Sequence, residues 1–189
     1  MKVPQRLIRA ILVILGIALF AVNIALIRKN RDLTTRLNAK FGSLMAAPGT
    51  SLPPLRGARA DGQDIIVGWD GKHDSLVMVF SVSCEFCEQN WPRWSSLVGK
   101  IDREQVNPVL VDITGRVTEG FLLVHKIQGL PLVQHVDPGF ITTYDVLFVP
   151  ETILVDPNGR VIKVWAGILQ PQDEADILRM CHDQVSHKA

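Results

Sequence analysis

The sequence of 189 residues contains few cysteines, and only three are present. Small secreted domains held together by disulfides use many more, so a disulfide-stapled scaffold is excluded. The sequence also has no internal repeat and no low-complexity tract. Its length and its 47% share of apolar residues allow one domain of about 100 to 150 residues with a real core, together with an additional segment.

The chain has little net charge, a formal +1, but this charge is divided unevenly. Residues 1–50 contain eight Lys or Arg and one acid, whereas residues 51–189 contain twelve Lys or Arg and eighteen acids, which gives +7 and −6. The basic part surrounds an apolar run, an arrangement that suits lipid headgroups. The acidic part has no basic stripe with interleaved aromatic residues, so no nucleic-acid partner is expected.

The apolar run covers residues 10–27, eighteen residues without a charge. This is close to the roughly 20 residues that a helix needs to cross the hydrocarbon core of a bilayer. Basic residues lie on both sides and no small-residue cleavage site follows, which favours an uncleaved anchor over a cleavable signal peptide. The sequence therefore predicts a basic N-terminus at 1–9, a transmembrane anchor at 10–27, a stalk or linker at 28–51 and a domain at 52–189.

The predicted stalk has an apolar pattern of its own. Leu33, Leu37, Phe41 and Leu44 recur at steps of three and four residues, the spacing of one helix face. An amphipathic helix that continues from the anchor and a partly ordered tether both agree with this pattern. Residues 48–54 contain three prolines, which end any helix and mark the domain boundary.

The rest of the chain alternates strands with helices. A continuous apolar run at 76–80 is typical of a strand buried on both faces. Strands are also predicted near 65–67, 109–113, 132–136, 152–155 and 161–165, and helices near 84–100, 119–127, 140–146 and 172–185. This alternation implies crossover connections and a central sheet with helices on both faces. Residues 156–159, Asp-Pro-Asn-Gly, are a strong signal for a hairpin between the last two strands.

Cys84 and Cys87 form a Cys-x-x-Cys pair where the buried strand gives way to a helix. At the amino terminus of a helix the first sulfur faces unpaired N–H groups and the positive end of the dipole, which stabilises its thiolate. The second thiol, one turn later, can displace a substrate from a mixed disulfide. We therefore predict that Cys84 is the nucleophile and Cys87 the resolving thiol.

Zinc sites also use Cys-x-x-Cys pairs, but the sequence has no second pair. A four-ligand site made of Cys84, Cys87, Cys181 and His182 is conceivable. However, Cys181 shares a predicted helix face with Ile177, where a cysteine more often packs as a small hydrophobe. We expect no metal and no other cofactor.

Two longer motifs follow one another in a known order. Residues 80–92 read FSVSCEFCEQNWP and residues 149–161 read VPETILVDPNGRV. Together they resemble the TlpA and ResA branch of membrane-anchored thioredoxin-like proteins, and the resemblance covers residues 52–185. It implies an α/β fold, a thioredoxin-like three-layer sandwich with a central mixed sheet, preceded here by the transmembrane helix. It also implies thiol-disulfide exchange with protein cysteines.

The resemblance assigns further roles and also has exceptions. It implies that Pro150 is a cis proline facing the active site, that Val149 offers backbone groups to an extended substrate, and that Pro92 bends the active-site helix. The departures are Ser83 in place of a tryptophan, Glu151 in place of a threonine, and Met78 and Asn90 at two positions where relatives carry an acid. Without those acids, the route by which protons move during exchange is open.

The sequence thus indicates an anchored thiol-disulfide oxidoreductase. Glu85 and Glu88 lie around the pair, and carboxylates near a sulfur disfavour its thiolate, which predicts that the pair reduces its substrates. The implied partners are a cysteine-containing protein, of which apocytochrome c is one type, and a transmembrane electron donor. One alternative is a metal- or partner-binding module without turnover. Another is a thiol peroxidase, whose proline and threonine are replaced here by Val77 and Ser81.

The side of the membrane follows from function more than from charge. More Lys and Arg follow the anchor than precede it, which by charge counting alone would keep the domain in the cytoplasm. Large domains cross largely regardless of charge, and disulfides form outside the cytoplasm. We therefore expect a single-pass protein of a bacterial inner membrane with its domain in the periplasm.

Overall fold

The computed structural model describes the backbone of residues 5–42, 46–146 and 148–186, and the side chains of residues 14–30, 32–33, 46–146 and 148–182. The chain forms two compact units, residues 1–43 and residues 44–189.

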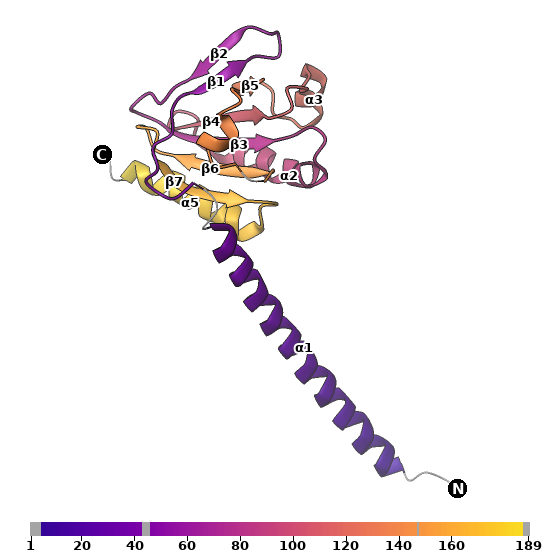
Figure 1. Ribbon diagram of the computed structural model, residues 1–189. Coiled ribbons are helices and arrows are strands. Elements are labelled where there is room, and N and C mark those ends of the chain that lie inside the picture. Colours follow the sequence, from indigo (N-terminus) through magenta and orange to yellow (C-terminus); the bar gives the residue numbers. More distant parts are fainter. Residues whose placement is uncertain (1–4, 43–45, 147, 187–189) are drawn as a thin grey trace. The chain divides into compact units, whose positions relative to one another are not determined.

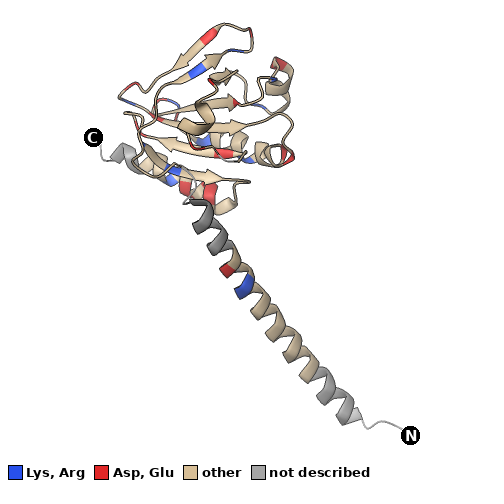
Figure 2. Ribbon diagram, in the orientation of Figure 1, with Lys and Arg blue, Asp and Glu red and all other residues tan. Residues whose placement is uncertain are grey.

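The described part of the first unit is one helix, α1 (Gln5–Gly42). Its backbone continues unbroken through residues 10–27 into the predicted stalk. Residues 14–27 contain no Lys, Arg, Asp or Glu, and Figure 2 shows a long tan stretch of this helix before its blue turn. Asn23, the polar residue of the apolar run, donates its Nδ2 to the Leu19 carbonyl at 3.0 Å. Leu37, Phe41 and Leu44 of the stalk pattern lie outside the described side chains. Among the residues that were described, no helix combines the length and the apolar character that a membrane crossing requires.

The described part of the second unit is built on a seven-stranded sheet in the order β2-β1-β5-β4-β3-β6-β7 (Figure 1). The strands are β1 (Leu55–Ala58), β2 (Asp64–Val67), β3 (Asp74–Phe80), β4 (Val106–Asp112), β5 (Leu132–Gln134), β6 (Glu151–Val155) and β7 (Val161–Ala166). β3, β4 and β5 run parallel, whereas β1 and β2 pair antiparallel at one edge and β6 and β7 at the other. The sheet is therefore mixed.

Helices cover both faces of this sheet, as the alternating pattern predicted. α2 (Glu85–Lys100), α3 (Glu119–Val124) and α5 (Pro171–Ser186) pack on one face, and α4 (Phe140–Thr143) packs on the other. β3 is buried along its whole length: Met78 and Phe80 face the core with α2, whereas Val77 and Val79 face the core with α4. This two-sided burial confirms the interpretation of the apolar run at 76–80.

Aromatic packing holds the first turns of α2 against the end of β3. Trp91 lies edge-on to both Phe80 and Trp94, with ring centroids 4.8 and 4.9 Å apart. Trp94 is fully buried and donates Nε1 to Thr152 Oγ1 at 2.9 Å, which ties α2 to β6. Such aromatic pairs contribute about 0.5–1.5 kcal/mol each beyond the area that they bury. The amino terminus of α2 therefore has a fixed place at the carboxyl end of β3.

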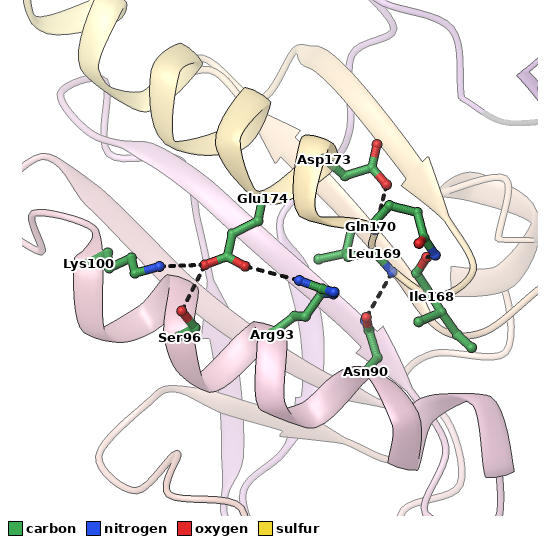
Figure 3. Close-up of polar contacts among 9 residues, drawn as sticks. All are labelled: Asn90, Arg93, Ser96, Lys100, Ile168, Leu169, Gln170, Asp173 and Glu174. Carbon is green, nitrogen blue, oxygen red and sulfur yellow. Dashed lines mark hydrogen bonds and ion pairs between the residues drawn. The ribbon is translucent and has the colours of Figure 1, made fainter.

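The other half of α2 is fastened to α5 through one carboxylate (Figure 3). Glu174 accepts hydrogen bonds from Lys100 Nζ and Ser96 Oγ, both at 2.7 Å, and its second oxygen lies 3.4 Å from Arg93 Nη1. The hydrogen bond from Lys100 is the main cause that lowers the pKa of Glu174 below its usual value. The helix that carries the cysteine pair is thus held along its length, and it continues through Pro92.

Several boundaries differ from those expected. Residues 46–51 were assigned to the linker, but Ala46 is buried and Gly49 donates its backbone N–H to Val161 O at 2.7 Å. The domain core therefore includes residues before 52. The sequence did not predict β1, because its four residues carry no regular alternation of polar and apolar side chains. The helices α3 and α4 end three residues earlier than predicted.

The predicted hairpin joins β6 to β7, and its glycine has two functions. Gly159 has a φ of 82°, which favours glycine. It also passes so close to Trp69 that a Cβ would lie 2.2 Å from the indole Cδ1. Trp69 Nε1 in turn donates to Leu52 O at 2.7 Å. The turn therefore also holds the segment that leads into β1.

Candidate active site

Cys84 lies where the sequence predicted it, as the residue that caps the amino terminus of α2. Its backbone is extended, with φ −94° and ψ 112°, and its Sγ accepts a hydrogen bond from the Cys87 N–H at 3.3 Å. The Glu88 N–H donates to the Cys84 carbonyl at 3.2 Å. Because the free N–H groups and the dipole at this end favour negative charge, the position suits a sulfur that must carry charge.

Cys87 lies one turn later in a different environment. Its side chain is 1% exposed, whereas Cys84 is partly accessible. Burial, and then the hydrogen bond with Cys84, raise the pKa of the Cys87 thiol far above its usual range. The charge of Glu88 acts in the same direction, and a backbone hydrogen bond with Ser81 opposes it. Both cysteines are free thiols, so the structure shows the dithiol form of an asymmetric pair.

The Val149–Pro150 turn, which the resemblance assigns to substrate binding, lies against Cys84. Cys84 Sγ lies 3.4 Å from the Val149 carbonyl oxygen, to which it can donate its proton. The Val149–Pro150 peptide bond is cis, as predicted from the resemblance. Pro150 O accepts from the Gly167 N–H at 2.8 Å, which anchors this turn to the end of β7. The fold therefore places Val149 and Pro150 beside the accessible sulfur, although 65 residues separate Val149 from Cys84.

Met78 and Asn90, the two positions where relatives carry an acid, have other roles in this structure. Met78 is buried in the core beneath α2. Asn90 is fully buried, and its Oδ1 accepts from the Leu169 N–H at 2.9 Å, so it joins α2 to the segment before α5 (Figure 3). Its Nδ2 has no hydrogen-bond partner among the described residues. Neither position therefore supplies a carboxyl near the cysteines. The sheet does hold a fully buried carboxyl opposite Phe80, that of Asp112, which accepts hydrogen bonds from backbone N–H groups of the loop after β4.

His125, which the sequence offers only as a scattered histidine without a clear role, packs against the first turns of α2. The ring of His125, at the end of α3, packs between Trp91 and Phe121 with centroid distances of 4.8 and 4.4 Å. Its Nε2 is 3.6 Å from Glu88 Oε1. Glu88 thus pairs across two helices, in addition to complementing the dipole of α2. No spacing in the sequence indicates this contact, because it depends on how α3 packs.

Glu151 is a buried acid on the opposite face of the sheet. It follows Pro150 directly and is 1% exposed, and its Oε1 has no hydrogen-bond partner among the described residues. Burial, and to a smaller extent the charge of Asp145, raise the pKa of Glu151 to about 8. The sequence marked this residue only as a departure from the expected threonine. The structure shows that the departure places an ionisable group behind the Val149–Pro150 turn.

Cys181 lies far from the pair. It lines a cavity of about 250 Å³ together with Ile101 and His182. Ile101 follows the last residue of α2, at the end opposite to Cys84. A helix of 16 residues separates its two ends by roughly 24 Å. The side chain is buried with Ile177, and burial, followed by the charge of Asp74, raises the pKa of its thiol to about 11. The structure therefore does not assemble the conceivable zinc set. Among the described residues, no group of three or more His, Cys, Asp or Glu could hold a metal ion.

Comparison with known proteins supports this architecture. No protein-family model matches the chain, and no curated protein matches it. Among solved structures, it is similar to a thiol:disulfide interchange protein from Bacteroides sp., with 19% identity, a TM-score of 0.58 and coverage of 72% of this chain and 91% of the other. It is similar to the thioredoxin domain of a thiol-disulfide oxidoreductase from Bacteroides vulgatus, with 19% identity, a TM-score of 0.58 and coverage of 71% and 96%. A peroxiredoxin-like protein from Aquifex aeolicus matches with 15% identity, a TM-score of 0.56 and coverage of 72% and 88%. These likenesses establish a thioredoxin-like fold.

Proposed function

We propose that this chain is a thiol-disulfide oxidoreductase that exchanges disulfides with cysteines of other proteins through Cys84 and Cys87. The observation that carries the proposal is the asymmetry of the pair. One partly accessible sulfur lies at the amino terminus of α2, 3.4 Å from the Val149 carbonyl, and the second thiol is buried one turn later. This arrangement suits an attacking thiol and a resolving thiol.

The exchange follows from these positions. The Cys84 thiolate attacks a substrate disulfide, forms a mixed disulfide and releases the first substrate sulfur, which takes up a proton. Cys87 then loses its proton and attacks the Cys84 sulfur, which releases the second substrate thiol. The Cys84–Cys87 disulfide is left behind, and two electrons have passed to the substrate. A dithiol partner must return two electrons to begin the next cycle.

Turnover is favoured over the capture of a metal ion. The pair supplies two sulfur ligands, and the described residues near it supply no third or fourth ligand of the kind that zinc or copper sites use. Val149, moreover, faces the accessible sulfur with a backbone carbonyl, a group that pairs with an extended polypeptide and not with a soft metal.

The direction of electron flow is proposed to be reduction. Glu85 and Glu88 lie in the first turn of α2, and the charge of Glu88 disfavours negative charge on the Cys87 sulfur. A less stabilised thiolate makes the dithiol less stable, and therefore makes the pair more reducing. Substrates of the cytochrome c maturation type fit this direction, with electrons supplied across the membrane by another protein.

A redox titration tests whether the two cysteines form a reversible redox pair and in which direction the pair works. The full chain in detergent is equilibrated against thiol–disulfide buffers, and the free thiols are then counted by alkylation. We expect a potential near that of thioredoxin, about −270 mV, and not near that of DsbA, about −120 mV. Cys181→Ala is the matched control and should leave the potential unchanged. A potential near the DsbA end would mean that the protein donates disulfides.

We also propose that residues 10–27 anchor the protein in a bacterial inner membrane with the domain in the periplasm. The uncharged run and the basic residues that flank it support this. Protease added to intact spheroplasts is expected to remove the domain, while an N-terminal tag stays with the membrane. Full protection of the domain, or release of the whole chain from washed membranes, would contradict the proposal.

A further inference from the structure

We infer that Glu151 is a proton-dependent positioning residue of the exchange site. While its carboxyl is protonated, the Val149–Pro150 turn stays against Cys84, and loss of that proton displaces the turn. The inference rests on the proposed exchange function, because it concerns how the same site is held.

Among the described residues, the side chains around Glu151 on its face of the sheet are largely apolar. In the sheet it lies opposite Val79 of β3 and Ala166 of β7. Ile153 and Val155, which alternate with it along β6, belong to the core on the α4 side, so Glu151 points into that core. Its Oε1 is buried and has no hydrogen-bond partner among the described residues, and a carboxylate in such a place either keeps its proton or moves to water.

The charged group that acts on Glu151 lies in the segment after α4. Asp145 has a φ of 56° and is exposed, and its negative charge adds to the effect of burial on Glu151. The neighbouring strands offer Val79 and Ala166 in register, so β3 and β7 supply no counter-charge at these positions. With its pKa raised to about 8, Glu151 is neutral at neutral pH and ionises in mildly alkaline solution.

The connection to the cysteines runs through two residues. Val149 O is within 3.4 Å of Cys84 Sγ, and Pro150 O is held by the Gly167 N–H at 2.8 Å. Hydrating the ionised carboxyl requires the start of β6 to move toward solvent, and Val149 moves with it. The accessible sulfur then loses its neighbour, and an extended substrate loses the backbone group that would receive it.

A pH profile of exchange tests this inference. The reduced full chain in detergent is mixed with a cysteine-containing peptide disulfide, and the exchange rate is measured from pH 6 to 9.5 for the parent and for Glu151→Gln. Any pH dependence of the exchange chemistry that does not involve residue 151 is common to both proteins, so the ratio of the two rates removes it. Because the protonated fraction falls about tenfold per pH unit above the midpoint, the parent-to-variant ratio should fall about tenfold by pH 9.

The variant Asp145→Asn distinguishes a proton-dependent role of Glu151 from a purely structural one. Removing this charge lowers the pKa of Glu151, so the fall in exchange rate should move to lower pH while Glu151 itself is unchanged. This variant also tests the inference if Glu151→Gln does not fold. Parallel profiles for the parent and the variants would overturn the inference, whereas absence of exchange in every protein, including the parent, would overturn the proposed function instead.

Discussion

Replacing Cys84 with serine is expected to abolish disulfide exchange, with a loss of roughly 10³-fold or more, because the covalent nucleophile is removed. Cys87→Ser should behave differently. Its first step needs only the partly accessible sulfur at the amino terminus of α2, so this variant should still attack a substrate disulfide. It should then stop, because no second thiol resolves the mixed disulfide.

The two variants are distinguished by mass spectrometry after acid trapping. Cys87→Ser should accumulate a covalent adduct with a cysteine-containing protein disulfide, Cys84→Ser should not, and Cys181→Ala should resemble the parent. In the parent dithiol, alkylation at mildly acidic pH should label Cys84 well before Cys87, whose thiol is buried and has a strongly raised pKa. Faster labelling of Cys87, or adducts on Cys87 instead of Cys84, would reverse the proposed roles.

Features with local causes could be predicted from the sequence. The apolar run at 76–80 indicates a strand buried on both faces because strands of that kind contain no polar alternation. The Cys-x-x-Cys pair after that strand indicates a helix terminus, and Cys84 caps α2 as expected. The hairpin at 156–159 follows from its Asp and Gly, and Asp156 Oδ1 does accept from the Asn158 N–H at 2.8 Å. In each case the signal and the structure lie within a few residues.

Features that depend on distant packing could not be predicted in this way. β1 is defined by its pairing with β2 and β5, and not by its own four residues. The contact of His125 with Glu88 joins residues from two helices. The burial of Glu151 depends on the strands on either side of it, so the sequence could show an unusual residue but not its environment. The resemblance to a family supplied the place of Pro150, which no local pattern indicates.

Glu151→Gln is expected to stabilise the domain in alkaline solution while leaving it unchanged near pH 4.5. The carboxyl has a pKa of about 8 in the folded protein and an ordinary value of about 4.3 when unfolded. Between these values the folded state binds one more proton than the unfolded state, so the free energy of unfolding falls as pH rises. At about 1.4 kcal/mol per pH unit, the parent loses up to about 5 kcal/mol of stability between pH 4.5 and 8 through this group.

Other acids do not obscure this effect, because their contributions have the opposite sign and a different pH range. Hydrogen bonds from Lys100 and Lys163 lower the pKa values of Glu174 and Asp176. These groups therefore add stability above their ordinary values, near 4, and lose it only in acid. Their contribution is constant from pH 5.5 upward and is the same in the parent and the variant.

Urea unfolding of the full chain at pH 5.5, 7 and 8.5 measures the difference, followed by tryptophan fluorescence, since all four tryptophans lie in the second unit. Glu151→Gln should become more stable than the parent by a margin that grows with pH. Glu85→Gln, which removes an exposed carboxylate from the first turn of α2, should show no such growth. If the parent and Glu151→Gln keep the same difference at all three pH values, the carboxyl ionises without penalty. It then has a route to water in the folded state, and a proton on it cannot be what holds the Val149–Pro150 turn in place.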